Sequence, residues 1–411
     1  MNSKIAFIKF GGMAFGGTEK VLQTIAANLP KNRYDVDFFY CDAAPYVGSN
    51  FQHIDTDNSR IEYCLENKVN LIKFNVEYKD VTTPYHDWLN TDFWDYFDEN
   101  NYDLLITGRG GYKEYPFYLI ENLTTIDTIH LSDHAENKSN VFKSVLLSNE
   151  QRKKWVQAGG KKRKSIIIPN PVEILSTNKS YDIGNKFVFG MHQRDDDDIF
   201  SSIPLEAYSQ IESPNTMFLL LGGSSKYKEQ SDRLGIKNIQ FFPTTPKLEN
   251  IHKFLNSLNV YAHGRKDGEQ CSTAIIEAMS HGLPVISHTA PSMGQAEQIS
   301  EGGFVAKSVL EYSGAMKKFI NEKDYYELVS ISSKNRYENT YSVSIVIEKY
   351  VNLIQDALET KPPNKINKKL LELENYLILL KLYSVKILRR ILRVLKKVVR
   401  IISRFSLIKI K

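Results

Sequence analysis

The chain has 411 residues, of which 42% are hydrophobic and 25% are charged. This length exceeds what one ordinary hydrophobic core accommodates and predicts two domains. Its three cysteines, Cys41, Cys64 and Cys271, are too few and too widely spaced for a disulfide framework or a metal knuckle, and they predict a reducing compartment. The first apolar run, Ile5–Ile8, is too short for a signal peptide and predicts a first strand. No apolar run reaches the 18 residues of a membrane span.

The formal net charge of +5 is unevenly distributed. Residues 361–411 carry fifteen Lys and Arg against two Glu, a net charge of +13, so the preceding 360 residues have a net charge of −8. A mildly acidic body with a strongly basic tail predicts an anionic partner for the tail.

The basic tail has a helical pattern between Tyr376 and Phe405. Cations recur every three or four residues, and apolar residues fill the positions between them: Arg389, Arg390, Arg393, Lys396, Lys397, Arg400 and Arg404 alternate with Ile387, Leu388, Ile391, Leu395, Val398, Ile402 and Phe405. This pattern is typical of a helix lying on an anionic membrane surface. A partner helix or a nucleic-acid-binding arm is the alternative. The continuous apolar face and the scarcity of stacking aromatics favour the membrane over nucleic acid.

Short apolar runs alternate with helical patterns, which predicts parallel sheets with crossover helices. In the first half the predicted strands are Ile5–Ile8, Val36–Tyr40, Leu104–Thr107, Thr128–Leu131, Val145–Ser148 and Ser165–Pro169. In the second half they are Phe187–Gly190, Met217–Gly223, Ile239–Phe242, Val260–His263 and Pro284–Ser287. The two series predict two doubly wound domains.

Prolines and the change to a basic composition indicate the domain boundaries. Pro169–Val172 stops the preceding strand, so we expect a first domain over residues 1–172 and a second over 173–340. A closing helix is expected within 341–360, from about Val343 to Leu358. The break at Lys361–Asn364 then precedes the membrane-associating tail, 361–411.

The stretch from His263 to Ser287 is the most specific in the chain. Glu269 and Glu277 are separated by seven residues, and a helical pattern runs from Ile275 to Met279. Ser272 and Thr273 are natural N-caps, so the helix is expected to begin there. Its free amides and the positive end of its dipole would face an anion such as a pyrophosphate. Taken alone, Glu269 would more often be a charged loop residue and Glu277 a solvated helix residue. Here the N-cap residues and the strand after the helix agree with a site at the end of a strand, where ligands of α/β sheets bind.

These residues resemble the pattern of retaining glycosyltransferases of family 4, over residues 1 to about 358. The glycine-rich segment Gly11–Glu19, the segments Ser148–Glu150 and Ile168–Asn170, and the strand pair Phe218–Gly223 and Ile239–Pro243 are similar to that family as well. The resemblance implies the GT-B fold: two doubly wound Rossmann-like parallel-sheet domains with a cleft between them, here followed by the basic amphipathic helix.

The resemblance also implies the donor site. Glu269 would contact the transferred sugar and Glu277 the ribose, while Ser272 and Thr273 would offer helix amides to the diphosphate. The family usually has Phe and Gly where this chain has Cys271 and Ser272. Arg194 would serve in the phosphate clamp, and the expected lysine after it is missing. From their positions, Arg265 or Lys266 would supply the second cation, because a leaving diphosphate develops negative charge.

The aspartates Asp195–Asp198 suggest either a divalent metal or a solvated turn. The turn is favoured because the diphosphate site already has cations and amides, so we expect no metal and no cofactor beyond the nucleotide sugar. Whether the donor is linked to UDP or to GDP is left open.

In the first half, Gly16 and Gly17 belong to a loop whose glycines let the backbone approach the donor closely. Their spacing does not match the dinucleotide fingerprint, which weakens a dehydrogenase interpretation, although Asp42 would suit a ribose contact. His130 ends a predicted strand, and the resemblance places such a histidine near the reacting sugar, as a positioning group. The alternative is a histidine satisfied by packing. His192 and His263 also stand at strand ends, and they are weaker candidates for a role at the site.

The sequence therefore predicts a metal-independent retaining hexosyltransferase of EC class 2.4. Its acceptor would be a glycan or a lipid-linked molecule, as in polysaccharide biosynthesis, at the cytoplasmic face of a membrane. One alternative is a catalytically degenerate GT-B scaffold recruited to membranes by its tail. Another is a GT-B epimerase or phosphorylase, whose fold is the same but whose glutamates are not normally spaced in this way.

Overall fold

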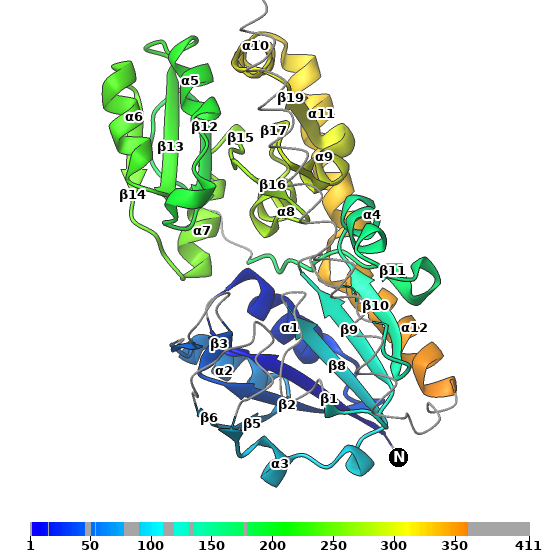
Figure 1. The fold of residues 1–411 in the computed structure, drawn as a ribbon. Helices are drawn as coiled ribbons and strands as arrows, with labels where there is room; N and C mark the ends of the chain where they lie inside the picture. The colour runs from blue at the N-terminus through cyan, green and yellow to red at the C-terminus, as the bar shows by residue number, and fades with distance from the viewer. Residues whose placement is uncertain are drawn as a thin grey trace, which may run out of the picture.

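The computed structural model describes residues 2–14, 16–45, 51–53, 55–77, 90–109, 119–130, 135, 137–175 and 179–360. It contains two parallel sheets flanked by helices, one in each half of the chain (Figure 1). The prediction of two doubly wound parallel-sheet domains is confirmed. The predicted amphipathic helix between residues 376 and 405 lies outside the described residues.

The first sheet has seven parallel strands in the order β11-β10-β9-β8-β1-β2-β5. Their bounds are Ser3–Phe10 (β1), Tyr34–Cys41 (β2), Asn70–Lys73 (β5), Leu104–Arg109 (β8), Thr125–Ile129 (β9), Val141–Leu146 (β10) and Ser165–Ile167 (β11). Successive residues of β1 point to opposite faces, so Ile5 and Phe7 enter one core while Ala6 and Ile8 enter the other. Burial on both faces explains why β1 is a continuous apolar run.

Helices and short ladders complete the first half. The helices are α1 (Gly17–Asn28), α2 (Asn58–Glu66), α3 (Phe93–Tyr96) and α4 (Asn149–Gln157), with short 3-10 turns η1 (Glu99–Asn101) and η3 (Lys162–Lys164). Two antiparallel pairs join β3 (Ala43–Pro45) to β4 (Phe51–His53) and β6 (Val76–Glu77) to β7 (Asn90–Thr91).

The second sheet has six parallel strands in the order β14-β13-β12-β15-β17-β19. Their bounds are Phe187–Gln193 (β12), Thr216–Gly222 (β13), Ile239–Phe242 (β14), Val260–Ala262 (β15), Val285–His288 (β17) and Gly303–Ala306 (β19). A small parallel pair joins β16 (Gly268–Glu269) to β18 (Ser292–Met293). The helices are α5 (Ile203–Ser209), α6 (Lys226–Leu234), α7 (Leu248–Leu255), α8 (Thr273–Ser280), α9 (Gly294–Ile299), α10 (Val309–Asn321) and α11 (Lys323–Thr340), with 3-10 turns η4 (Asp197–Ile199) and η5 (Ser300–Gly302).

The chain crosses between the two sheets twice, at neighbouring places. Val172, on the first crossing, donates its backbone N–H to Tyr341 O on the second at 3.2 Å. The helix that follows, α12 (Val343–Glu359), matches the helix expected over Val343–Leu358. It returns to the first sheet, where Tyr350 and Ile354 join the same core as Ile5. The end of the described chain therefore packs on the domain in which the chain begins (Figure 1).

The sequence-based predictions misplaced one strand and missed two edge strands. The structure begins β9 at Thr125, three residues before the predicted start, because the buried Asp127 is satisfied there by Thr107 and Arg109. The edge strands β5 and β19 were missed because none of the residues of β5 and only Ala306 of β19 is fully buried. Within the described ranges, no helix has both the length and the apolar character needed to cross a membrane.

Candidate donor site between the two sheets

Each sheet reverses its strand order once, between β1 and β8 in the first and between β12 and β15 in the second. Ligands of open α/β sheets bind beyond the carboxyl ends of the strands at such a point. Arg109 ends β8 on one side, and His263 follows β15 on the other. The helices α1 and α8 lie at these edges and face each other across the boundary between the sheets (Figure 1).

Glu277 lies on the buried side of α8 and is 7% exposed. One carboxylate oxygen, Oε2, lies 2.8 Å from His192 Nε2 at the end of β12. The other, Oε1, lies 3.3 Å from Lys20 Nζ, which comes from α1 in the first half of the chain. Burial by itself raises the pKa of the Glu277 carboxyl, but the charge of Lys20 and the contact with His192 together lower this pKa to about 2. Glu277 is therefore a carboxylate at neutral pH, held from both sides of the cleft.

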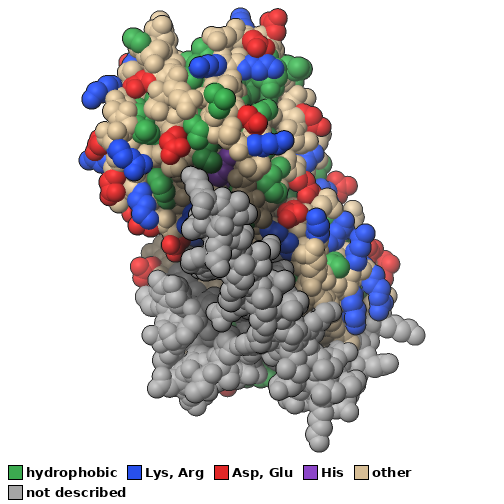
Figure 2. All heavy atoms as spheres, turned by 45° about the horizontal axis from the view of Figure 1, so that its top comes forward, with side chains coloured by type: hydrophobic (Ala, Val, Ile, Leu, Met, Phe, Trp, Pro, Cys, Tyr) green, Lys and Arg blue, Asp and Glu red, His purple; other side chains and the backbone are tan. Residues whose placement is uncertain are grey.

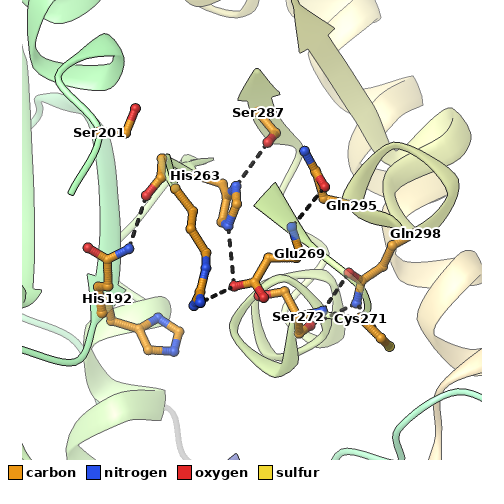
Figure 3. Close-up of polar contacts among 12 residues, drawn as sticks. His192, Ser201, His263, Glu269, Cys271, Ser272, Ser287, Gln295 and Gln298 are labelled. Carbon is orange, nitrogen blue, oxygen red and sulfur yellow. Dashed lines mark hydrogen bonds and ion pairs between the residues drawn. The ribbon is translucent and has the colours of Figure 1, made fainter. Parts of the chain in front are cut away.

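Glu269 lies in β16, just before α8. His263 Nε2 lies 3.9 Å and Arg265 NH1 lies 3.4 Å from Glu269 Oε1, while the Glu269 backbone N–H donates to Gln295 Oε1 at 3.0 Å (Figure 3). Burial acts to raise the pKa of this carboxyl, but His263 and the positive charge of Arg265 bring it below its ordinary value. Glu269 is thus a second carboxylate without a proton at pH 7, and it accepts hydrogen bonds.

The helix α8 begins at Thr273 with Ser272 as the N-cap, as predicted. The Ser272 side chain makes no capping hydrogen bond, and its backbone N–H donates to Gln298 Oε1 at 2.9 Å. The glycine-rich loop of the first half lies against this turn: a Cβ added to Gly17 would stand 3.7 Å from Thr273 Oγ1. Glycine at position 17 therefore lets the loop approach Thr273 without a side chain between them.

The turn before Glu269 requires glycine. Gly268 has a φ of +71°, and a Cβ there would lie 1.9 Å from the backbone oxygen of Ser292. This close approach allows β16 to pair with β18, which places Glu269 opposite Met293 in the ladder.

Across the cleft, the carboxyl edge of the first sheet carries buried charges. Arg109 forms a two-point ion pair with Asp127, with Arg109 Nε 2.7 Å from Asp127 Oδ1. Lys9 Nζ lies 3.1 Å from Glu19 Oε1. His130 is 6% exposed, and burial together with the nearby Lys9 charge lowers the pKa of its imidazole to about 4. His130 is therefore neutral at pH 7.

Several buried polar atoms at these edges lack a hydrogen-bond partner among the described residues. They are His192 Nδ1, Arg265 Nε and Gln270 Oε1 in the second half, and His130 Nε2 in the first. Buried polar atoms in native proteins nearly always have partners, so each exception calls for an explanation. These four atoms are candidates for contact with a bound polar ligand.

The contacts of Arg194, Lys266 and the aspartate run are made with residues other than Glu269 and Glu277. Arg194 has a side chain that is 66% exposed and pairs with Asp196 at 2.7 Å. Lys266 is exposed, and its backbone N–H donates to Ile199 O. The aspartate run is used locally, with Asp197 paired to Lys226 at 3.1 Å. Among the described residues, no three His, Cys, Asp or Glu side chains are grouped as metal ligands would be. A separate hollow, lined in part by Asn185 and Asn215, lies at the opposite, amino-terminal edge of the second sheet.

The sequence did not predict Lys20, Gln295 and Gln298 as residues of the site. His192 and His263 were only minor candidates. The histidines follow a recognisable rule, because both stand at the carboxyl ends of predicted strands. No local pattern identifies Lys20, which follows Gly16–Glu19 as an ordinary helix residue and meets Glu277 only through the fold.

Comparison with known proteins gives a match in sequence over part of the second half of the chain and a match in fold over 86% of the chain. Residues 202–339 match the model of the family described as glycosyl transferases group 1. No curated protein sequence matches the chain. The matched stretch contains α8 and both glutamates of the site.

Several solved structures share the fold at low identity. Anabaena HepE, crystallised with UDP and glucose, has a TM-score of 0.65 at 16% identity, over 86% of this chain and 100% of that one. The sucrose-phosphate synthase of Thermosynechococcus elongatus has a TM-score of 0.63 at 13% identity, over 86% and 99%. The lipopolysaccharide outer core galactosyltransferase WaaB has a TM-score of 0.61 at 15% identity, over 86% and 99%. The chain thus has the GT-B fold, and the stretch that carries Glu269 and Glu277 matches the group 1 glycosyl transferases.

Proposed function

We propose that the protein is a glycosyltransferase that transfers a hexose from a nucleotide sugar to a glycan or lipid-linked acceptor, with retention of the anomeric configuration. The observation that carries the proposal is the surroundings of α8. Two ionised carboxylates, an uncapped helix N-terminus and unpartnered polar atoms meet at the switch point of the second sheet. This stretch lies within the match to the group 1 glycosyl transferases.

The two domains take different substrates in this proposal. Residues 173–340 bind the donor, with Glu277 accepting hydrogen bonds from the ribose hydroxyls and Glu269 from hydroxyls of the sugar. The diphosphate lies against the amide of Thr273 at the start of α8, where the helix dipole favours an anion, while the Ser272 amide donates to Gln298 Oε1. Residues 1–172 face the acceptor. HepE, with UDP and glucose bound, has the same fold, which supports a nucleotide-sugar donor.

We propose that the anomeric configuration is retained by substitution on the front face of the sugar, as the family resemblance implies. The acceptor oxygen bonds to the anomeric carbon on the face from which the diphosphate departs, as the bond to the diphosphate breaks. The acceptor proton passes to an oxygen of that leaving diphosphate. Neither glutamate holds a proton at pH 7, so neither acts as the general acid. His130 is neutral and orients a hydroxyl through Nε2. Arg265 and the α8 amides stabilise the developing charge without a metal.

A donor screen tests the proposal. The protein is incubated with UDP- and GDP-linked hexoses and candidate acceptors in EDTA, and products are detected by intact mass. Glu269→Gln is expected to lower kcat/KM by about 100-fold or more, the size of effect seen when one transition-state contact is removed. Glu249→Gln is the matched control, because Glu249 is an exposed partner of Lys179 on the same domain. Unchanged turnover in folded Glu269→Gln would count against the assignment.

One observation favours a second function. Arg194, expected in the phosphate clamp, is largely exposed and paired with Asp196, as a catalytically degenerate scaffold would allow. A thermal-shift panel of nucleoside diphosphates separates the two functions, since a scaffold that has lost its donor site shows no shift.

We also propose that the protein associates peripherally with anionic membranes at the cytoplasmic face. The basic tail, residues 361–411, supports this, and Lys and Arg side chains also gather on the surface formed by α4 and η3 (Figure 2). Lys153, Lys161, Lys162 and Arg163 are exposed there. Deletion of residues 361–411 is expected to release the protein from phosphatidylglycerol vesicles, and retained binding would contradict the role of the tail.

A further inference from the structure

The turn after β1, residues 11–14, is held by groups of α1 and α2, which pack against each other. Gln23 on α1 is fully buried, and its side-chain Nε2 donates to Gly12 O at 2.6 Å. The next carbonyl oxygen along the chain, Met13 O, accepts the backbone N–H of Asp57, the N-cap of α2, at 2.7 Å. Two successive peptide groups of the turn are therefore fixed in orientation by residues outside it.

Arg60 on α2 decides which way the amide of Gln23 faces. Arg60 Nε lies 2.6 Å from Gln23 Oε1, and a guanidinium N–H can only donate. The amide oxygen of Gln23 must therefore face Arg60, which leaves the Nε2 hydrogens for Gly12 O. Without Arg60, nothing prevents the amide from turning its oxygen toward Gly12 O, where two acceptors would oppose each other.

The guanidinium of Arg60 is itself held in one place. Arg60 NH1 lies 3.5 Å from Glu173 Oε2, and the guanidinium stacks over the ring of Tyr63 at 4.1 Å. Tyr63 follows Arg60 by three residues on α2, and its hydroxyl donates to Glu173 Oε1. Burying a cation that is only 7% exposed costs free energy, which these contacts offset. Apolar side chains would fill the space at lower cost but would leave Gly12 O without a donor.

The turn that receives these bonds begins at the carboxyl end of β1. The first sheet reverses its strand order there, which is where ligands of open α/β sheets bind. The backbone has little room: Gly11 has a φ of +58°, and a Cβ added to Gly12 would lie 2.8 Å from Phe38 Cε1. A rotation of the Gly12 peptide is therefore passed along the chain toward Gly17, which approaches Thr273 in the first turn of α8.

We propose that Gln23 and Arg60 are positioning residues that set the conformation of residues 11–14 and, through this turn, the approach of Gly17 to Thr273. The consequence for catalysis rests on the proposed function, in which the donor diphosphate lies against the start of α8. Neither side chain touches the donor in this proposal, and both act through the backbone of the turn.

Gln23→Glu tests the pair most directly. Its carboxylate accepts from Arg60 and stays ionised beside that cation, but it offers no N–H to Gly12 O. Exchange of backbone amides with deuterium, followed by peptide mass spectrometry, measures how firmly residues 11–14 are held. Gln23→Glu and Arg60→Met are each expected to exchange these amides about 5- to 10-fold faster than the wild type, the effect of losing about one hydrogen bond. Residues 104–109 of β8 are expected to exchange at the wild-type rate.

Lys31→Met is the matched control for the loss of a cation. Lys31 Nζ donates to Ala26 O at 2.7 Å, beyond the end of α1 that is far from the turn, so this variant is expected to exchange like the wild type. Unchanged exchange of residues 11–14 in Gln23→Glu would overturn the proposal, and this variant decides alone if Arg60→Met fails to fold. Exchange that rises equally in β8 would reduce the pair to a general structural role, and would also overturn it.

Transfer kinetics give the second measurement. With the donor and acceptor that the wild type uses, Gln23→Glu is expected to lower kcat/KM by about 10- to 100-fold at an unchanged urea midpoint, as a small displacement near the reacting groups does. A loosened turn with the kcat/KM of the wild type would overturn the effect on transfer. If the wild type transfers no hexose, the proposed function fails, while the exchange comparison still decides whether Gln23 and Arg60 position the turn.

Discussion

Acid is expected to destabilise the first domain through His130. Burial and the Lys9 charge lower the pKa of this imidazole to about 4 in the folded protein, against an ordinary value of about 6.5 in the unfolded chain. Between these values the unfolded state binds the additional proton, so stability falls as the pH decreases below about 6.5 and the loss is complete below about 4. A difference of 2.5 pKa units corresponds to about 3.4 kcal/mol in total, of which about 2 kcal/mol is lost by pH 5.

The assay is urea unfolding at pH 7.5 and at pH 5, followed by tryptophan fluorescence, to which the buried Trp155 contributes. This tryptophan is fully buried in the same cluster as Ile129, next to His130, and so reports on the relevant part of the first domain. His130→Gln removes the titrating group, and its free energy of unfolding is expected to change between the two pH values by about 2 kcal/mol less than that of the wild type. Equal pH dependence in both proteins, at unchanged urea m-values, would refute the argument.

Three further perturbations have defined outcomes. Asp127→Asn removes the buried carboxylate partner of Arg109 and is expected to cost about 3–5 kcal/mol of stability, measured by the urea midpoint. Gly268→Ala places a methyl group against Ser292 O at a positive φ; it is expected to lower the Tm by about 4 °C or more and to weaken nucleotide binding. Burial raises the pKa of the Cys271 thiol to about 12, so iodoacetamide at pH 8 is expected to leave it unlabelled in native protein and to label it in urea, by mass spectrometry.

The sequence was sufficient for the fold wherever strands are buried on both faces. Ile5–Ile8 and Phe218–Leu221 form continuous apolar runs because helices cover both sides of each sheet. β9 was placed late because Thr125 and Asp127 are polar yet buried, which hydropathy cannot distinguish from a loop. The start of α8 at Thr273 was correct, although the Ser272 side chain makes no capping hydrogen bond in the structure.

In the candidate site, too, the sequence predicted the local features and missed the contacts between distant residues. Glu269 and Glu277 belong to one loop and the helix that follows it, so their proximity could be predicted from a short stretch of sequence. Arg194 was expected near the diphosphate from its place after β12, and its side chain pairs with Asp196, two residues on. Lys20 and Glu277 are 257 residues apart, and their contact depends on how α1 and α8 are oriented across the cleft. No window of sequence contains that information.

A buried carboxylate needs partners for its charge. His192 contacts Glu277 Oε2 from the end of β12, in the same half of the chain. Lys20 contacts Oε1 from α1, in the other half. In the proposed donor complex the ribose hydroxyls are neutral donors, so they cannot by themselves offset the cost of burying the charge on Glu277, and the contact with His192 keeps this carboxylate partnered.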